Sequence, residues 1–92
     1  MVPIHPGRIL RRELSARQLS ANALARALRV PSGRIVDILN GKRSVTAETA
    51  PRLGRYFGNA PQFWINLQGQ YDLAVAMRDV GWLVKREVQT AA

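Results

Sequence analysis

Two short helical patterns, separated by a tight turn, occupy the middle of the chain in the segment SANALARALRVPSGRIVDILNGKR. Ser20 is a good N-cap for a helix over Ala21–Leu28, because its side-chain oxygen can accept a hydrogen bond from the first turn. Pro31 cannot continue this helix but suits the start of another, which we expect over Ser32–Leu39 and which Asn40-Gly41 would end. Such a pair, joined by about three or four residues, is typical of a helix-turn-helix unit.

A helix-turn-helix unit presents the N-terminal end and the outer face of its second helix to the major groove of DNA. Ala25 would let the two helices approach closely. A set of apolar residues would form the wedge between the helices and the core: Leu24, Leu28, Val30, Ile35, Ile38 and Leu39. The remaining positions of the second helix face outward, and we predict that they read bases: Ser32, Gly33, Arg34 and Asp37.

Arg34 is the strongest candidate for a base contact, because a guanidinium group can bond O6 and N7 of guanine together. Asp37 would accept a hydrogen bond from cytosine or orient Arg34. Phosphate contacts need charge or donors at the edge of the groove, and we assign them to Asn22, Asn40, Lys42 and Arg43. Further arginines would add long-range attraction: Arg8, Arg12 and Arg26.

Three other helices complete the prediction. Pro6 and Gly7 open the first, which should end near residues 15–19, and the single histidine, His5, should cap or pack against it. Thr46 is the expected cap of the fourth helix and Gly58 its stop. A longer fifth helix starts at Asn59 or Ala60 with Pro61 in its first turn. Since no segment alternates as a strand does, we expect an all-α, five-helix fold with a DNA-binding domain over residues 1–78 and a helical extension over residues 79–92.

The fifth helix carries two apolar patterns. Phe63, Leu67, Tyr71 and Ala74 recur every three or four residues, which favours burial in the core over stacking on bases. A second stripe consists of Leu73, Met77, Val80 and Val84, and we assign it to a dimer interface. The alternative is that this stripe folds back on its own domain, with Gly81 breaking the helix.

Charge favours a polyanionic partner. The net charge is +8, and the excess lies in residues 1–60, which hold eleven Lys/Arg and three acids against three of each afterwards. The chain contains no cysteine, which suits a reducing cytoplasm and excludes cysteine-ligated metal, and a lone histidine makes no plausible metal site. Scattered acids and serines without a histidine at catalytic spacing indicate that the chain is not an enzyme and needs no cofactor. We expect neither a signal peptide nor a membrane span.

Several motifs together resemble one family. They are the opening His5-Pro6-Gly7, the loop Asn40-Gly41-Lys42-Arg43, and Phe63-Trp64-x-Asn66-Leu67-Gln68 followed by Tyr71-Asp72-Leu73. With the helix-turn-helix segment they resemble the HigA-type antitoxins, a branch of the lambda-repressor-like (Xre) proteins. The resemblance covers most of residues 3–75. It implies a small dimeric repressor that binds a palindromic operator in double-stranded DNA at its own operon and neutralises a partner toxin, an mRNA-cleaving ribonuclease.

The chain departs from this family at the turn, Arg29-Val30-Pro31, where the family commonly has Gly-Val-Pro. The departure places Arg29 where a left-handed backbone is often needed. Two other functions stay open at this stage. The chain could be a stand-alone transcriptional regulator without a toxin, which the neighbouring gene would decide. It could also be an RNA-binding or ribonuclease module, although it lacks catalytic residues and an aromatic sheet face.

Overall fold

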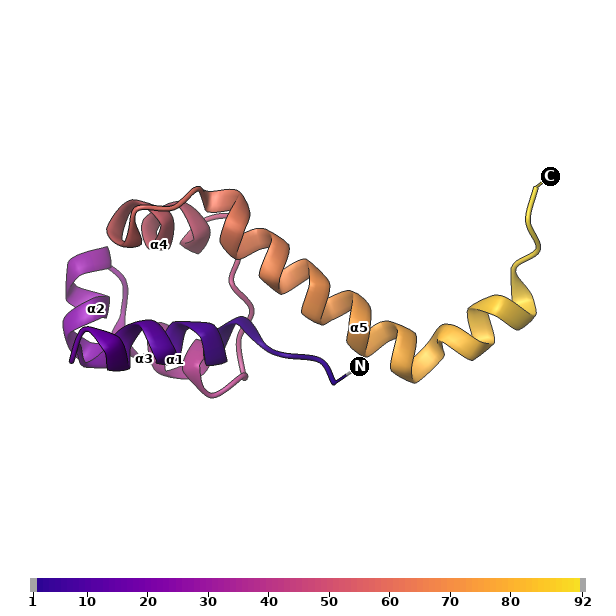
Figure 1. The fold of residues 1–92 in the computed structure, drawn as a ribbon, viewed down its shortest axis with the longest axis horizontal. Coiled ribbons are helices and arrows are strands. Elements are labelled where there is room, and N and C mark those ends of the chain that lie inside the picture. Colours follow the sequence, from indigo (N-terminus) through magenta and orange to yellow (C-terminus); the bar gives the residue numbers. More distant parts are fainter. Residues whose placement is uncertain (1, 92) are drawn as a thin grey trace.

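The computed structural model describes residues 2–91, and over that range the chain is all-α. The helices are α1 (Pro6–Ala16), α2 (Ala21–Leu28), α3 (Ser32–Leu39), α4 (Thr49–Phe57) and α5 (Pro61–Glu87). Figure 1 shows that α1 to α4 and the start of α5 form a body from which the rest of α5 projects, so the molecule measures 50 × 22 × 22 Å. The expected five-helix fold is confirmed. None of the helices between residues 2 and 91 combines the length and apolarity needed to cross a bilayer.

The boundaries of α2 and α3 agree with the predicted ones. The Ser20 side chain accepts a hydrogen bond from the backbone nitrogen of Ala23 at 3.0 Å, as expected of an N-cap. Arg29 ends α2 in the left-handed region, with φ 61° and ψ 44°. The next residue, Val30, then donates its N–H back to Ala25 at 3.0 Å, which closes the helix end. The left-handed backbone expected at Arg29 is therefore present in a residue other than glycine, although it costs about 1 to 2 kcal/mol.

One core joins all five helices. The predicted wedge is confirmed, because Leu24, Leu28, Ile35 and Ile38 are buried and Val30 and Leu39 pack partly buried against them. Other helices and the loop before α4 complete the cluster with Leu10, Leu14, Val45, Ala50, Leu53 and Trp64. Gly7 lets α1 approach α3, since a Cβ at this position would collide with the carbonyl oxygen of Ile38. The helix-turn-helix pair α2–α3 thus shares one hydrophobic core with α1, α4 and the start of α5.

The start of α4 differs from the prediction. Thr46 does accept a hydrogen bond from the backbone nitrogen of Thr49, at 3.3 Å, but residues 47 and 48 form a turn and the helix begins at Thr49. Glu48 therefore occupies the N-cap position that was expected for Thr46. The end at Gly58 is confirmed, with φ 79°. From the N-cap position the Glu48 side chain contacts Arg34 of α3.

Two expectations for α5 are wrong. Phe63 is 42% exposed, and its neighbour Trp64 is the aromatic residue that is fully buried. Leu67, Tyr71 and Ala74 are half-buried. Gly81 does not break the helix, since α5 continues to Glu87, although Figure 1 shows that it bends in its second half. The part of α5 that reaches the core begins at Pro61, in the first helical position, where its missing N–H costs least.

Gln68 anchors the loop between α3 and α4 to α5. Its side chain is buried; Oε1 accepts from the backbone nitrogen of Val45 at 2.8 Å and Nε2 donates to Asp72 Oδ1 at 2.9 Å. A buried amide with both ends bonded avoids the cost of an unsatisfied polar group. This link fixes the loop that carries Lys42 and Arg43.

Candidate nucleic-acid interface

The predicted base-reading residues follow the outer face of α3. Ser32 and Gly33 lie exposed in its first turn, and Arg34 and Asp37 are half-buried. A Cβ added to Gly33 would meet no atom within 4 Å, so the surface above it is open. Another molecule can therefore approach the N-terminal end of α3 closely.

Arg34 is held by a residue from a different element. Its Nη1 donates to Oε2 of Glu48 at 2.9 Å, and Oε1 of the same carboxylate accepts from Nε of Arg52 at 2.9 Å. Arg52 in turn donates from Nη1 to the backbone oxygen of Leu28 at 2.8 Å. The prediction that Asp37 orients Arg34 is wrong: the nearest basic group to Asp37 is Arg43, at 3.9 Å. The partner of Arg34 is fourteen residues away in the chain, and no local pattern points to it.

The predicted phosphate-binding residues are all exposed and lie on two segments. Asn22 is on the first turn of α2, and Asn40, Lys42 and Arg43 form the loop after α3. Gly41 allows that loop to turn with φ 73°, and the backbone N–H of Lys42 donates to the backbone oxygen of Asp37 at 2.8 Å. The three loop residues are thereby brought together at the C-terminal end of α3.

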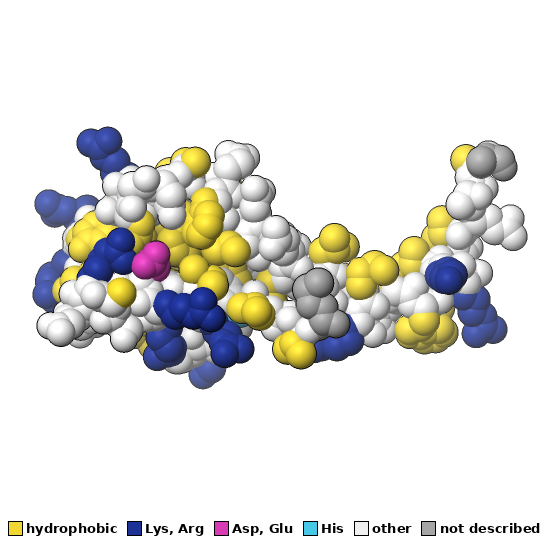
Figure 2. Space-filling view, in the orientation of Figure 1, with side chains coloured by type: hydrophobic (Ala, Val, Ile, Leu, Met, Phe, Trp, Pro, Cys, Tyr) yellow, Lys and Arg dark blue, Asp and Glu magenta, His cyan; other side chains and the backbone are white. Residues whose placement is uncertain are grey.

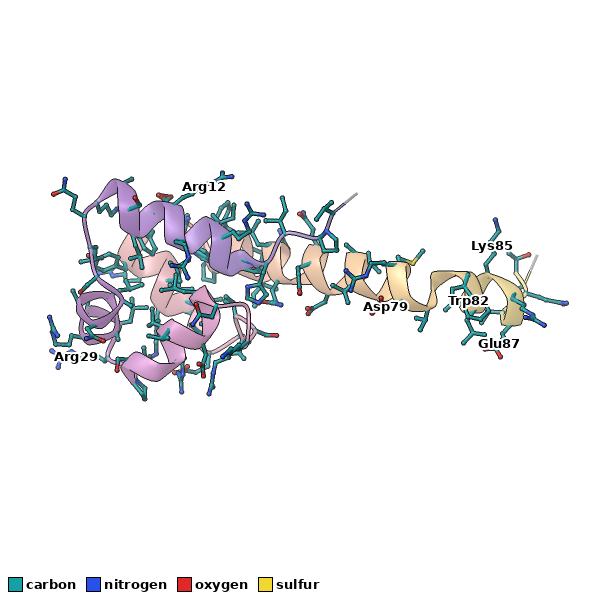
Figure 3. The ribbon with its side chains drawn as sticks, turned by 90° about the horizontal axis from the view of Figure 1, so that it is seen from below. Arg12, Arg29, Asp79, Trp82, Lys85 and Glu87 are labelled. Atoms are coloured by element: carbon teal, nitrogen blue, oxygen red, sulfur yellow. The ribbon has the colours of Figure 1, made fainter. Side chains whose placement is uncertain are left out.

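Arg11 is a residue that sequence reasoning missed. Its Nη2 donates from α1 to the backbone oxygen of Leu39 at 3.2 Å and to Oδ1 of Asn40 at 3.2 Å. A cation at the C-terminal end of a helix also interacts favourably with the helix dipole. Arg11 therefore fixes the end of α3 and engages the amide oxygen of Asn40. The neighbouring Arg12 projects from α1 on the side away from α3 (Figure 3), which is consistent with a long-range role only.

His5 caps α1, as expected. Its Nδ1 accepts from the backbone nitrogen of Gly7 at 2.9 Å, and its ring lies edge-on to Tyr71 of α5 with centroids 4.9 Å apart. Burial lowers the pKa of this imidazole, while Asp72 and the backbone of Arg43 act in the opposite direction. In its neutral form, His5 therefore connects the start of α1 with α5 and with the loop that follows α3.

The state of His5 gives a pH-dependent stability. Because its folded-state pKa lies below the ordinary value of 6.5, its contribution is fully present above that pH and is lost as the pH falls through the lowered pKa. We expect urea unfolding between pH 7.5 and pH 5 to show a loss of up to about 1 kcal/mol, the usual worth of an N-cap. The matched control is His5→Asn, which can cap without titrating. If the unfolding free energy of the wild-type protein and that of His5→Asn depended on pH in the same way, this role of His5 would be contradicted.

Hydrophobic side chains are exposed along the projecting part of α5. Figure 2 shows them there and also on the body, where most of the Lys and Arg side chains gather. The residues of the predicted stripe are exposed by 63% (Leu73), 60% (Met77), 44% (Val80) and 50% (Val84). The alternative in which the stripe folds back on its own domain is therefore wrong. Leu73 and Met77 also line a surface depression with Gln70, Ala74 and Arg78.

Comparisons with known proteins point to one group. No model of a known protein family matches the chain. The virulence-associated protein I of Dichelobacter nodosus is 52% identical over 80 residues, which are 86% of this chain and 74% of that protein. An addiction module antidote protein of the HigA family from Coxiella burnetii has a TM-score of 0.95 and 48% identity, over 98% of this chain and 99% of its own. The Pseudomonas aeruginosa antitoxin HigA, solved with the higBA promoter, has a TM-score of 0.95 and 44% identity, over 99% of this chain and 100% of its own.

Proposed function

The chain belongs to the HigA family of helix-turn-helix antitoxins, and on that premise we propose that it is a DNA-binding antitoxin that represses its own operon. The observation that carries this function is the α2–α3 pair, whose second helix exposes its N-terminal turn on a strongly basic body. The similarity to an antitoxin solved with promoter DNA supports it. Such a regulator acts in the cytoplasm, and its role is binding and not catalysis.

Arg34 reads a base, together with Ser32, Gly33 and Asp37, while Asn22, Asn40, Lys42 and Arg43 contact phosphates. The two sets lie in different places: the first follows the outer face of α3, whereas the second comes from the first turn of α2 and from the loop after α3. Base contacts discriminate between sequences, whereas phosphate contacts hold register and contribute equally to all DNA. The DNA-binding unit spans residues 1–78, and residues 79–92 extend it.

Two copies bind one palindromic operator. A single short recognition helix reads few bases, and such units usually act in pairs on half-sites about one helical turn apart. The exposed stripe on α5 supplies the contact between copies, because an apolar stripe left in water favours association. Dimerisation places two α3 helices on one operator.

Two substitutions separate base reading from phosphate contact. We expect Arg34→Ala to cost about 1 to 3 kcal/mol at the base that it reads and to abolish discrimination there. Lys42→Ala should weaken binding to all duplexes alike and lower the salt dependence by about one phosphate contact. The measurement is a titration of operator DNA, single-base operator variants and a random duplex at two salt concentrations. Equal losses on operator and random DNA for Arg34→Ala would show that this residue does not read a base.

The partner toxin is an mRNA-cleaving ribonuclease encoded beside the antitoxin. This part of the proposal follows from family membership. It is tested by expressing the adjacent reading frame with and without this chain: growth arrest that this chain relieves supports it. If expression of the adjacent reading frame does not arrest growth, the alternative remains, which is a stand-alone regulator of the same fold.

A further inference from the structure

Glu48 connects three parts of the helix-turn-helix unit. It lies at the N-cap of α4, and its two carboxylate oxygens each accept a hydrogen bond at 2.9 Å, from Arg34 on α3 and from Arg52 on α4. Arg52 is itself bonded to the backbone oxygen of Leu28, at the end of α2. The guanidinium of Arg34 is thereby tied to both helices that flank α3.

The contact leaves most of the Arg34 guanidinium available. Only Nη1 is engaged by Glu48, and a guanidinium carries five N–H donors in a planar fork. The edge formed by Nε and Nη2 can therefore still bond O6 and N7 of guanine while Glu48 stays in place. The side chain is 29% exposed, so part of it is within reach of another molecule.

Glu48 also shapes the charge around α3. Arg34, Arg43, Ser44, Thr46, Glu48 and Thr49 line one surface depression beside the recognition helix. A carboxylate there opposes the entry of a phosphate, which would otherwise be the natural ligand of two arginines. The Arg34 side chain is thereby biased toward a neutral hydrogen-bonding partner such as a base edge.

We propose that Glu48 is a positioning residue for base recognition: it holds Arg34 oriented for guanine and lowers its attraction for phosphate. This inference rests on the proposed function and deepens it. An oriented side chain loses less conformational freedom on binding, which favours the cognate base. The carboxylate weakens binding to DNA in general, so the same residue raises the ratio of specific to non-specific affinity.

A purely structural role would have a different signature. Exposed ion pairs contribute little to stability, typically about 0 to 1 kcal/mol. The Glu48 side chain makes no capping hydrogen bond to α4, so its removal takes no such bond from that helix end. The variant Glu48→Ala should therefore fold, which circular dichroism verifies.

The test compares Glu48→Ala with Glu13→Ala. Glu13 also pairs with an arginine, Arg17 at 2.8 Å, but it lies on α1 and away from Arg34. Both variants remove one carboxylate and raise the net charge equally, so long-range attraction to DNA is matched. Affinities are measured for three kinds of duplex: the operator, operators changed at the base pair where Arg34→Ala loses discrimination, and random DNA.

We expect Glu48→Ala to lower discrimination at that base pair about three- to tenfold, the cost of ordering one long side chain. Glu13→Ala should leave the discrimination unchanged. In an Arg34→Ala background, Glu48→Ala should have no further effect on it, because the two residues act as one unit. Unchanged discrimination in Glu48→Ala, or an additive loss in the double variant, would overturn the inference. If the wild-type protein itself did not prefer the operator to random DNA, the proposed function would fail instead, so the two failures are distinguishable.

Discussion

We expect the double variant Leu73→Asp, Met77→Asp to be a folded monomer that binds the palindromic operator about 10²- to 10⁴-fold more weakly than the wild-type protein, because linkage between two half-sites is lost. Both side chains are more than half exposed in the monomer, so their replacement leaves the core intact. Buried in a symmetric interface, four carboxylates would be desolvated and would repel one another. Light scattering gives the oligomeric state and circular dichroism the helicity.

Trp82→Asp provides the matched control for this variant. Trp82 is 62% exposed and lies on the same helix, about two and a half turns after Leu73 and thus on the opposite face. Figure 3 shows it on the projecting end of α5. If the stripe forms the interface, Trp82→Asp remains a dimer with nearly full operator affinity. A dimer that persists in the double variant would place the interface elsewhere, with α1 or the terminal segment as the next candidates.

The largest loss of stability is expected from Trp64→Ala. Trp64 is fully buried, and its Nε1 donates to Oδ1 of Asn59 at 2.9 Å. Removing a buried tryptophan leaves a cavity, and the expected cost is about 3 to 5 kcal/mol of unfolding free energy. That is a large part of the about 5 to 15 kcal/mol that stabilises a typical domain. Urea or thermal unfolding measures the difference.

Phe63→Ala is the appropriate comparison, because Phe63 precedes Trp64 and packs edge-on to it with ring centroids 5.2 Å apart. Being 42% exposed, Phe63 should contribute well under half as much. If Phe63→Ala lowered the unfolding free energy as much as Trp64→Ala, the orientation of α5 described above, with Trp64 facing the core and Phe63 half exposed, would be wrong.

Short-range signals are sufficient to place α2 and α3. Ser20, Pro31 and the Asn40-Gly41 pair act on their own backbone or on residues within one turn, so their effect does not depend on the rest of the fold. The left-handed backbone at Arg29 was instead expected from the resemblance, because the family commonly has glycine at this position. The apolar spacing of α2 and α3 likewise identifies the residues that are buried between them, because a helix of known extent has a known face.

Which of two neighbouring residues on α5 is buried depends on packing against parts of the chain that are distant in sequence. Phe63 and Trp64 are both large and aromatic, and which of them turns into the core depends on where α4 lies. The helical pattern alone favoured Phe63, and the structure buries Trp64. The exposure of the Leu73 stripe depends on the same packing, because the second half of α5 projects from the body (Figure 1).

The partner of Arg34 shows why local patterns have a limit. Asp37 is three residues away on the same helix, the spacing at which side chains of a helix meet, yet the carboxylate that binds Arg34 belongs to Glu48. Glu48 lies in the turn that precedes α4, and Arg52 of α4 donates to the other oxygen of its carboxylate. The helix-turn-helix pair follows from hydrogen bonds within a turn or two of the chain, whereas the orientation of Arg34 depends on a contact with Glu48 that exists only once α4 has packed against α2.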